Sequence, residues 1–199
     1  INVSMGYESG NEDLRTMVLR RKENTDQIVQ AAILCKNAGV RTSSYNMIGL
    51  PYESRQTLFQ TVELNKKAGV QDPSVNFWYP LEGTELWKIA IEEGLYDPEN
   101  CEEVNNREGG DKPHIPIEGM TSEEVIAFKK RFHIYVKLPY EFFKYIKRSE
   151  IDDELGQALF LKLLDIYEKQ VLLTDDGLWN QEASIEDYLA EVEKIVGRE

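Results

Sequence analysis

The stretch that decides the fold lies at residues 45–53 and reads Tyr45-Asn46-Met47-Ile48-Gly49-Leu50-Pro51-Tyr52-Glu53. It ends a short apolar run with glycine, proline and a carboxylate, and a helix-like pattern follows it. Residues 5–12 and 79–84 have the same character. Polar groups at the carboxyl ends of successive parallel strands build the active sites of α/β barrels and open α/β sheets. We therefore expect the chemistry of this chain at these three strand ends.

The first 96 residues predict alternating strands and helices. The expected strands cover residues 2–7, 40–48 and 74–79, and a short helix is expected at 11–19. Three further helices are expected, from Thr25 to Gly39, from Ser54 to Gly69 and from Thr84 to Ile91. The first of them should bury Ile28, Ala32, Cys35 and Ala38, and the second Leu58, Val62 and Ala68.

A short internal repeat supports this interpretation. Residues 36–40 and 66–70 share the pattern Lys-x-Ala-Gly-Val, and their separation equals about one strand–helix unit. Parallel strands joined by right-handed helical crossovers satisfy this pattern. The sequence therefore predicts an α/β fold with about three parallel strand–helix units, a partial (β/α) barrel.

The rest of the chain predicts a connector and a helical region. Residues 97–120 form the expected connector, rich in Gly, Pro and Asn, and 121–199 the expected all-helical part. Thr121-Ser122-Glu123-Glu124 is a capping box, and Pro139 should break the helix that it begins. The apolar positions expected on the buried faces of these helices are Val125, Phe128, Phe132, Tyr135, Leu155, Leu159, Leu163, Ile166, Ile185, Leu189, Val192 and Val196.

Composition excludes some classes of protein. The formal net charge of −13 argues against nucleic-acid binding, which needs a basic face. No apolar run has membrane-spanning length, and no secretory signal opens the chain. We therefore expect a protein that neither spans a membrane nor is secreted. Cys35 and Cys101 stand far apart, which favours a reducing cytoplasm over a disulfide scaffold. Because the chain opens on Ile1 inside a strand-like run, we interpret it as a piece of a longer protein.

Several short segments carry a resemblance to a known family. They are Gly6-Tyr7-Glu8-Ser9-Gly10-Asn11-Glu12 with Leu14, Met17 and Arg20; Ala38-Gly39-Val40; Ile48-Gly49-Leu50-Pro51 with Glu53 and Thr57; and Tyr79-Pro80 with Gly83, Thr84 and Leu86. In this order and spacing, over about residues 1–96, the sequence resembles the carboxyl-terminal half of a radical SAM core domain. It is similar to the group that often carries a cobalamin-binding domain upstream, which includes anaerobic Mg-protoporphyrin IX monomethyl ester oxidative cyclase-like proteins.

The resemblance implies that this chain holds roughly the last three units of a partial (β/α)6 barrel. In such enzymes a [4Fe–4S] cluster and S-adenosylmethionine generate a 5′-deoxyadenosyl radical, which abstracts hydrogen from a small-molecule substrate. The cluster is held by C-x-x-x-C-x-x-C in the first half of the barrel, and that motif is absent here. The rest of its own chain is thus the expected partner, cobalamin is a candidate further cofactor, and the fragment alone is expected to be inactive.

The resemblance also implies roles for residues of the first strand end. Glu8, with Ser9 beside it, matches a position that hydrogen-bonds the ribose hydroxyls of S-adenosylmethionine, as a carboxylate acceptor can. Arg20 matches the position that pairs with the methionyl carboxylate. The alternatives are that Glu8 caps the following helical turn and that Arg20 is a surface arginine with Arg21 beside it.

At the second strand end, Gly49 would let the backbone approach the adenine. Met47 and Ile48 would either contact the adenine or pack in the core. Tyr79 and Pro80 would lie against the adenine or the substrate, with a packing role as the alternative.

Two residues of the second strand end stand outside these cofactor contacts. The family commonly has glycine where this chain has Tyr52, so the loop shape is expected to differ. Glu53 is interpreted as a cap of the helix that begins near Ser54.

Two other functions remain open. One is a non-catalytic interaction module on a degenerate half-barrel, and the other is a hydrolase that uses a pair among Glu8, Glu53 and Glu82. Half a barrel should leave an open strand edge at residues 2–7 and an uncovered apolar inner face. We therefore expect a homodimer of this fragment, or coverage of that edge by the C-terminal helices.

Overall fold

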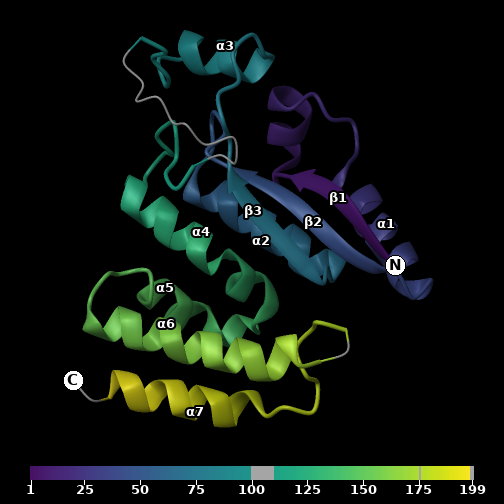
Figure 1. The fold of residues 1–199 in the computed structure, drawn as a ribbon, viewed down its shortest axis with the longest axis vertical. Coiled ribbons are helices and arrows are strands. Elements are labelled where there is room, and N and C mark those ends of the chain that lie inside the picture. Colours follow the sequence, from purple (N-terminus) through teal and green to yellow (C-terminus); the bar gives the residue numbers. More distant parts are fainter. Residues whose placement is uncertain (100–109, 175, 198–199) are drawn as a thin grey trace. The chain divides into compact units, whose positions relative to one another are not determined.

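Three parallel strands form the sheet of this α/β protein, in the order β1-β2-β3 (Figure 1). The computed structural model describes residues 1–99, 110–174 and 176–197. The strands are β1 (Asn2–Glu8), β2 (Arg41–Ile48) and β3 (Asp72–Phe77). The chain packs as two compact units, residues 1–129 and 130–199, and the boundary falls within helix α4.

The two helices between the strands begin and end where the local sequence dictates. Helix α1 (Thr25–Asn37) is capped by Asn24, whose side chain accepts from the backbone of Gln27 while Gln27 bonds back. Helix α2 (Arg55–Ala68) has the same reciprocal capping box between Ser54 and Thr57. It ends at Gly69, which takes the left-handed conformation (φ 62°) that costs glycine nothing.

Helices α1 and α2 pack against each other and against β2, and they cover one face of the sheet (Figure 1). The apolar core of this layer combines strand and helix residues: Tyr7, Ile28, Val29, Ala32, Leu64, Ala68 and Val70. A buried polar network lies beside it. Asn65 of α2 accepts from Ser44 (2.5 Å) and donates to Asn46 (2.8 Å), so the polar side chains on the helix-facing side of β2 are satisfied.

The opposite face of the sheet is mainly polar, so the expected apolar inner face is wrong. Side chains alternate along each strand, and the parallel register places the residues of this face side by side. They are Asn2, Ser4, Gly6, Arg41, Ser43, Tyr45, Met47, Asp72, Ser74 and Asn76. Asn2 donates to the Ser43 hydroxyl across the β1–β2 pair (2.8 Å). The large buried side chains of the strands, Tyr7, Ile48 and Phe77, lie on the opposite, helix-facing side.

A second apolar cluster lies beyond the carboxyl ends of the strands. Helix α3 (Glu85–Glu92), capped by Thr84, contributes Ala90, and the segment after residue 110 contributes Ile115. Leu50 and Trp78 complete the buried cluster, with Met47, Leu19, Leu86, Leu95 and Tyr96 packed against it. Parts of the predicted connector therefore belong to the packing of the first unit.

The second unit is helical in the described residues. Helix α4 (Ser122–Lys137) begins at the predicted capping box, with reciprocal bonds between Thr121 and Glu124. It ends before Pro139, as expected. The helices that follow are η2 (Tyr140–Phe142), α5 (Phe143–Arg148), α6 (Glu154–Tyr167), η3 (Glu168–Leu172) and α7 (Ile185–Val196).

Some details of the predicted elements are wrong, whereas the short helix expected at 11–19 is present over residues 12–18. The cap of α1 is Asn24 rather than Thr25, and Ala38 lies exposed at the end of α1. The helix expected at 11–19 contains one π-helical segment, η1 (Leu14–Val18), in which Leu19 N–H bonds five residues back to Leu14. Strand β3 begins at Asp72 and ends at Phe77, because an edge strand tolerates Pro73 where a central strand would not.

In the described part of the chain, no helix is long and apolar enough to cross a membrane. Cys101 and the rest of residues 100–109, which belong to the predicted connector, lie outside the described residues.

Candidate functional site

The three motif-bearing segments meet at one edge of the sheet. Because β1, β2 and β3 are parallel and adjacent, their carboxyl ends point the same way. Residues 8–12, 49–53 and 78–80 follow these ends directly. This edge is where parallel α/β folds place their ligands, and it is the candidate site.

Glu8 is held in an unusual position at the end of β1. A register shift between Gly6 and Glu8 interrupts the pairing with β2, and Glu8 takes a left-handed backbone conformation (φ 61°). Its carboxyl group folds back over Gly6, where an added Cβ would lie 2.3 Å from Glu8 Oε1. The glycine therefore leaves the space that the carboxyl group occupies. Left-handed backbone at a bulky residue is sparse and clusters at functional sites.

The partner of Glu8 is Arg21. Arg21 donates to Glu8 Oε1 at 3.1 Å and also pairs with Glu23. Burial raises the pKa of Glu8 above its usual range, the Arg21 charge opposes that rise, and Glu23 adds to it. Glu8 does not cap the following helical turn, because Asn11 does so by accepting from Leu14 N–H (2.7 Å).

Replacing Arg21 with glutamine should raise the pKa of Glu8, because the favourable charge is lost while Glu23 remains. Titration of the Glu8 carboxyl carbon by NMR measures this directly. Arg20→Gln is the matched control: Arg20 pairs with Glu85 (2.7 Å), so its loss should leave the titration of Glu8 unchanged. An unchanged Glu8 titration in Arg21→Gln would contradict the assigned pair.

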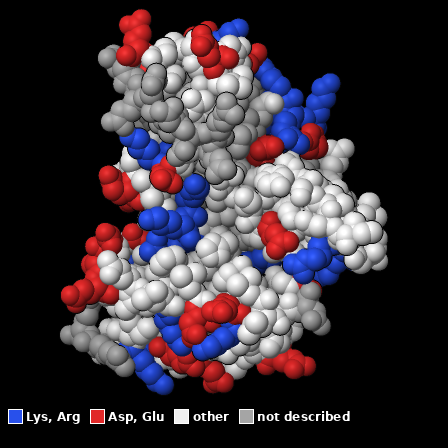
Figure 2. All heavy atoms as spheres, in the orientation of Figure 1, with Lys and Arg blue, Asp and Glu red and all other residues white. Residues whose placement is uncertain are grey.

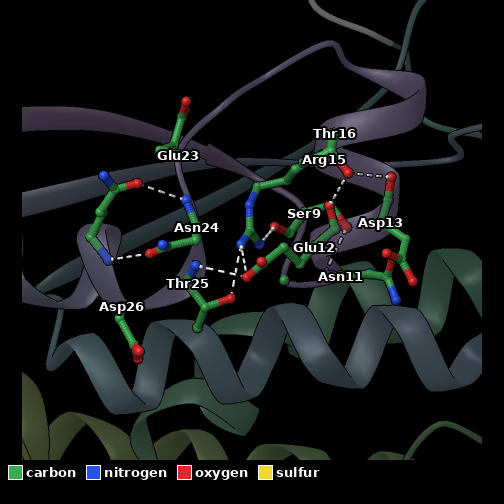
Figure 3. Close-up of polar contacts among 12 residues, drawn as sticks. Ser9, Asn11, Glu12, Asp13, Arg15, Thr16, Glu23, Asn24, Thr25 and Asp26 are labelled. Carbon is green, nitrogen blue, oxygen red and sulfur yellow. Dashed lines mark hydrogen bonds and ion pairs between the residues drawn. The ribbon is translucent and has the colours of Figure 1, made fainter.

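A buried arginine anchors the loop after Glu8 (Figure 3). Arg15 is fully buried and donates to the backbone carbonyl of Ser9 (2.7 Å) and to the hydroxyl of Thr25 (2.8 Å). Glu12 lies 3.5 Å from the guanidinium and accepts from Thr25 N–H (3.0 Å), which lowers its pKa. Burial lowers the pKa of Arg15. These bonds join the β1 end to the start of α1.

The same loop rests directly on helix α2. Gly10 N–H donates to the Thr61 hydroxyl (2.8 Å), and the Asn11 amide donates to Gln60 (2.8 Å). A Cβ on Gly10 would lie 2.0 Å from the Gln60 carbonyl oxygen. Only glycine allows this approach of two backbones.

The end of β2 contains a buried carboxylic acid. Glu53 is 2% exposed, and its Oε2 accepts from the backbone N–H groups of Gly49 (2.6 Å) and Leu50 (3.1 Å). Its Oε1 has no hydrogen-bond partner among the described residues. Burial raises the pKa of Glu53 to about 8 against the two backbone bonds that lower it. The expected helix cap is wrong: Ser54 caps α2, and Glu53 instead holds the Gly49–Leu50 turn.

Tyr52 takes a backbone conformation that is unusual for a tyrosine. Its backbone is left-handed (φ 64°), a conformation that glycine adopts without strain. Its hydroxyl donates to Glu93 (2.8 Å) on the surface. The backbone at position 52 thus has a conformation that favours glycine, although a tyrosine occupies it.

The end of β3 leaves one aromatic ring accessible. Tyr79 is 42% exposed and makes an edge-on contact with His114, with ring centroids 5.2 Å apart. Pro80 is buried. Met47 packs against the apolar cluster of Leu50 and Trp78, whereas Ile48 is buried on the opposite, helix-facing side of β2.

The predicted site residues therefore lie at one edge of the sheet, but they are not equally accessible to a ligand. Ser9 is fully buried, and its hydroxyl accepts from Asn11 N–H (3.2 Å). The Arg20 side chain is 65% exposed and pairs with Glu85 of α3. Gly49 takes the positive φ (85°) that its turn requires. Glu82 is exposed while Glu53 is buried, an arrangement that gives no support to a hydrolytic pair of these acids.

Three residues of this edge were missed or misjudged from the sequence: Arg15, Arg21 and Glu53. Four arginines and lysines crowd residues 15–22, and nothing in their order shows which one folds inward. A signal existed for Glu53, since a carboxylate four residues after a turn glycine can reach that turn's N–H groups.

Among the described residues, no group of three or more His, Cys, Asp or Glu side chains is placed to hold a metal ion. Comparison with known proteins returns no matching family model and no matching curated protein.

Proposed function

We propose that residues 1–96 are the carboxyl-terminal half of a radical SAM core and form one wall of its S-adenosylmethionine pocket. The observation that carries this proposal is the gathering of the three motif segments at the carboxyl ends of adjacent parallel strands. The motif residues are spread over some 80 positions of sequence, and the parallel strands bring them to one edge, as a shared cofactor site requires.

The chain's own residues fit the nucleoside cofactor in part. Glu8 carries an acceptor carboxylate near the open face of the sheet, and Arg20 carries an exposed guanidinium near the same edge. Each is engaged by an ion pair with an accessible partner, Arg21 and Glu85. The exposed Arg20–Glu85 pair is weak in water, so a ligand carboxylate can replace Glu85 on Arg20. On the partly buried Glu8, ligand hydroxyls would have to displace Arg21.

The iron–sulfur cluster does not fit the residues of this chain. Cys35 lies half-buried on α1, and Cys101 is outside the described residues. Two isolated cysteines do not make the C-x-x-x-C-x-x-C set. We therefore assign the cluster, and the radical chemistry that it and S-adenosylmethionine would supply together, to the first half of the barrel in a longer protein. This chain contributes binding and shielding, with a cobalamin domain as a candidate neighbour.

S-adenosylmethionine should bind the isolated chain weakly, with a dissociation constant above about 1 mM by calorimetry, because half of the expected contacts are missing.

In the longer protein, the residues before Ile1 should contain the three spaced cysteines, and Glu8→Gln should weaken S-adenosylmethionine binding by about tenfold. Glu12→Gln, an exposed neighbour, is the control. Tight binding by the isolated chain would overturn the site map, and a longer protein without the cysteines would overturn the function.

The alternative, a non-catalytic interaction module on a degenerate half-barrel, is favoured by one observation. The two charged side chains best suited to ligand contact, Glu8 and Arg20, are both paired within the chain. The sequence before Ile1 separates the two functions, because an interaction module has no need of cluster cysteines.

A further inference from the structure

The polar face of the sheet, opposite α1 and α2, has two halves. At the amino ends of the strands its side chains bond to one another across all three strands. Asn2 donates to the Ser43 hydroxyl (2.8 Å), and that hydroxyl donates to Asp72 (3.5 Å). Arg41 of β2 forms an ion pair with Asp72 of β3 (3.5 Å). The polar groups of this half are therefore satisfied within the chain.

The half nearer the carboxyl ends has polar side chains without such bonds. Tyr45 lies at its centre and is 53% exposed, and the register places Gly6 of β1 and Ser74 of β3 beside it. The next position along β3 on this face is the exposed Asn76, which pairs with Met47. Within the described part of the chain, the side chains of Tyr45, Ser74 and Asn76 have no hydrogen-bond partner. We call these three residues the open polar half.

The open polar half continues into the candidate site. A Cβ on Gly6 would project onto this face and would lie 2.3 Å from Glu8 Oε1. The Glu8 carboxyl group therefore lies over the face, next to the row that holds Tyr45. Where Figure 1 draws β1, the surface in Figure 2 is largely free of acidic and basic side chains. The carboxyl edge, where parallel α/β folds bind ligands, is thus bordered by an uncharged polar surface.

The polarity of this face restricts what can cover it. Parallel sheets occur almost only with both faces covered. Helices α1 and α2 cover one face (Figure 1). In the barrel of the proposed function, on which the substrate assigned below rests, the other face is the inner wall. An apolar molecule against that wall would leave hydroxyl and amide groups without partners, which weakens binding. The molecule that fills the space must therefore offer hydrogen bonds.

We propose that the open polar half binds the hydroxyl groups of a neutral, polyhydroxylated small molecule, which is the substrate. A hydroxyl group both donates and accepts, as do the hydroxyls of Tyr45 and Ser74 and the amide of Asn76. These three side chains are uncharged, and the neighbouring Glu8 is already paired with Arg21. The surface thus has no free charge that would attract a charged substrate. The exposed ring of Tyr45 adds an apolar surface on which the carbon skeleton of a polyol can pack.

NMR titration of this chain with two ring compounds tests the proposal. The probes are myo-inositol, which carries a hydroxyl on every ring carbon, and cyclohexanol, which has the same carbon ring and a single hydroxyl. We expect myo-inositol to shift the Asn76 side-chain amide saturably, with a dissociation constant on the order of 10 mM. Cyclohexanol should bind at least about tenfold more weakly, because it leaves most of the polar groups unpaired. No saturable shift, or equal binding of the two probes, would overturn the proposal.

Three variants locate the binding on the face. Tyr45→Phe keeps the ring and removes the hydroxyl, and Asn76→Leu removes the amide at similar volume. Each should weaken myo-inositol binding by about fivefold, read from the Asn76 amide in the first variant and from the Tyr45 ring in the second. Asn2→Leu is the matched control, because the Asn2 amide is already bonded to Ser43 and should not contribute. Circular dichroism should show all three folded, since the altered side chains are exposed. Unchanged binding in both Tyr45→Phe and Asn76→Leu would place the polyol elsewhere.

The same titration of the longer protein separates a substrate from a protein cover. Myo-inositol should bind there more tightly than to this chain, because the closed barrel adds contacts. Loss of the Asn76 response would show that protein side chains fill the face, against the proposal. The titration needs neither S-adenosylmethionine nor the cluster cysteines. Cysteines without a polyol response would therefore refute the substrate class alone, and a polyol response without cysteines would refute the radical chemistry alone.

Discussion

Replacing Gly10 with alanine will lower the free energy of unfolding by about 3 kcal/mol or more, because the new methyl group has no space. Its Cβ would lie 2.0 Å from the Gln60 carbonyl oxygen and 2.3 Å from Thr61 N, and both are backbone atoms. A side chain could rotate away, but a helix backbone cannot. The loop must lift from α2, which also breaks the Gly10–Thr61 hydrogen bond.

Urea denaturation followed by circular dichroism measures this loss. Gly39→Ala is the matched control: Gly39 has a positive φ (68°), but nothing lies within 4 Å of its added Cβ. That substitution should cost only the strain of a left-handed residue, about 1 kcal/mol. Equal losses in the two variants would show that the loop does not rest on α2 as described.

Raising the pH from 4.5 to 8 will destabilise the fold through Glu53. The folded-state pKa of this buried group is raised from 4.5 to about 8. Below pH 4.5 the group is protonated in both states and its contribution is fully present. Between these values the unfolded chain ionises while the folded chain stays protonated, so stability falls. Each unit of pKa difference is worth about 1.4 kcal/mol, which makes the loss a few kcal/mol.

Glu53→Gln isolates this contribution. The amide oxygen keeps the acceptor for the N–H groups of Gly49 and Leu50, but the side chain no longer titrates. Unfolding free energies from urea denaturation at a series of pH values should lose their fall between pH 5 and 8. Glu12→Gln is the control, because the lowered pKa of Glu12 affects stability only as the pH falls. A pH profile unchanged by Glu53→Gln would refute the buried acid.

Much of the fold could be predicted because its signals are local. Ser54 and Thr57 form a capping box through neighbouring backbone groups, and Gly69 ends the same helix by its own conformational freedom. Pro139 cannot continue a helix, and α4 ends before it. Such signals act within one turn of chain. They were least reliable at β3, where Pro73 indicates a loop unless its outward, edge position is known.

The candidate site was harder to predict because its chemistry depends on contacts between distant segments. Arg20 and Arg21 are adjacent and chemically identical, yet one meets Glu85 and the other Glu8. Arg15 is buried only because the β1 loop folds against the start of α1. Glu53 has a raised pKa only because the surrounding chain excludes water from it.

The sequence by itself determined the three strand–helix units and the place of the motifs at the strand ends, because periodicity, caps and turn glycines act locally. Only the tertiary structure decided which charged groups pair, which are buried and which sheet face stays polar. Burial and pairing are set by residues far apart in the chain. The residues at the carboxyl ends of the strands are thus given by the sequence, but their ion pairs, burial and pKa shifts depend on the fold.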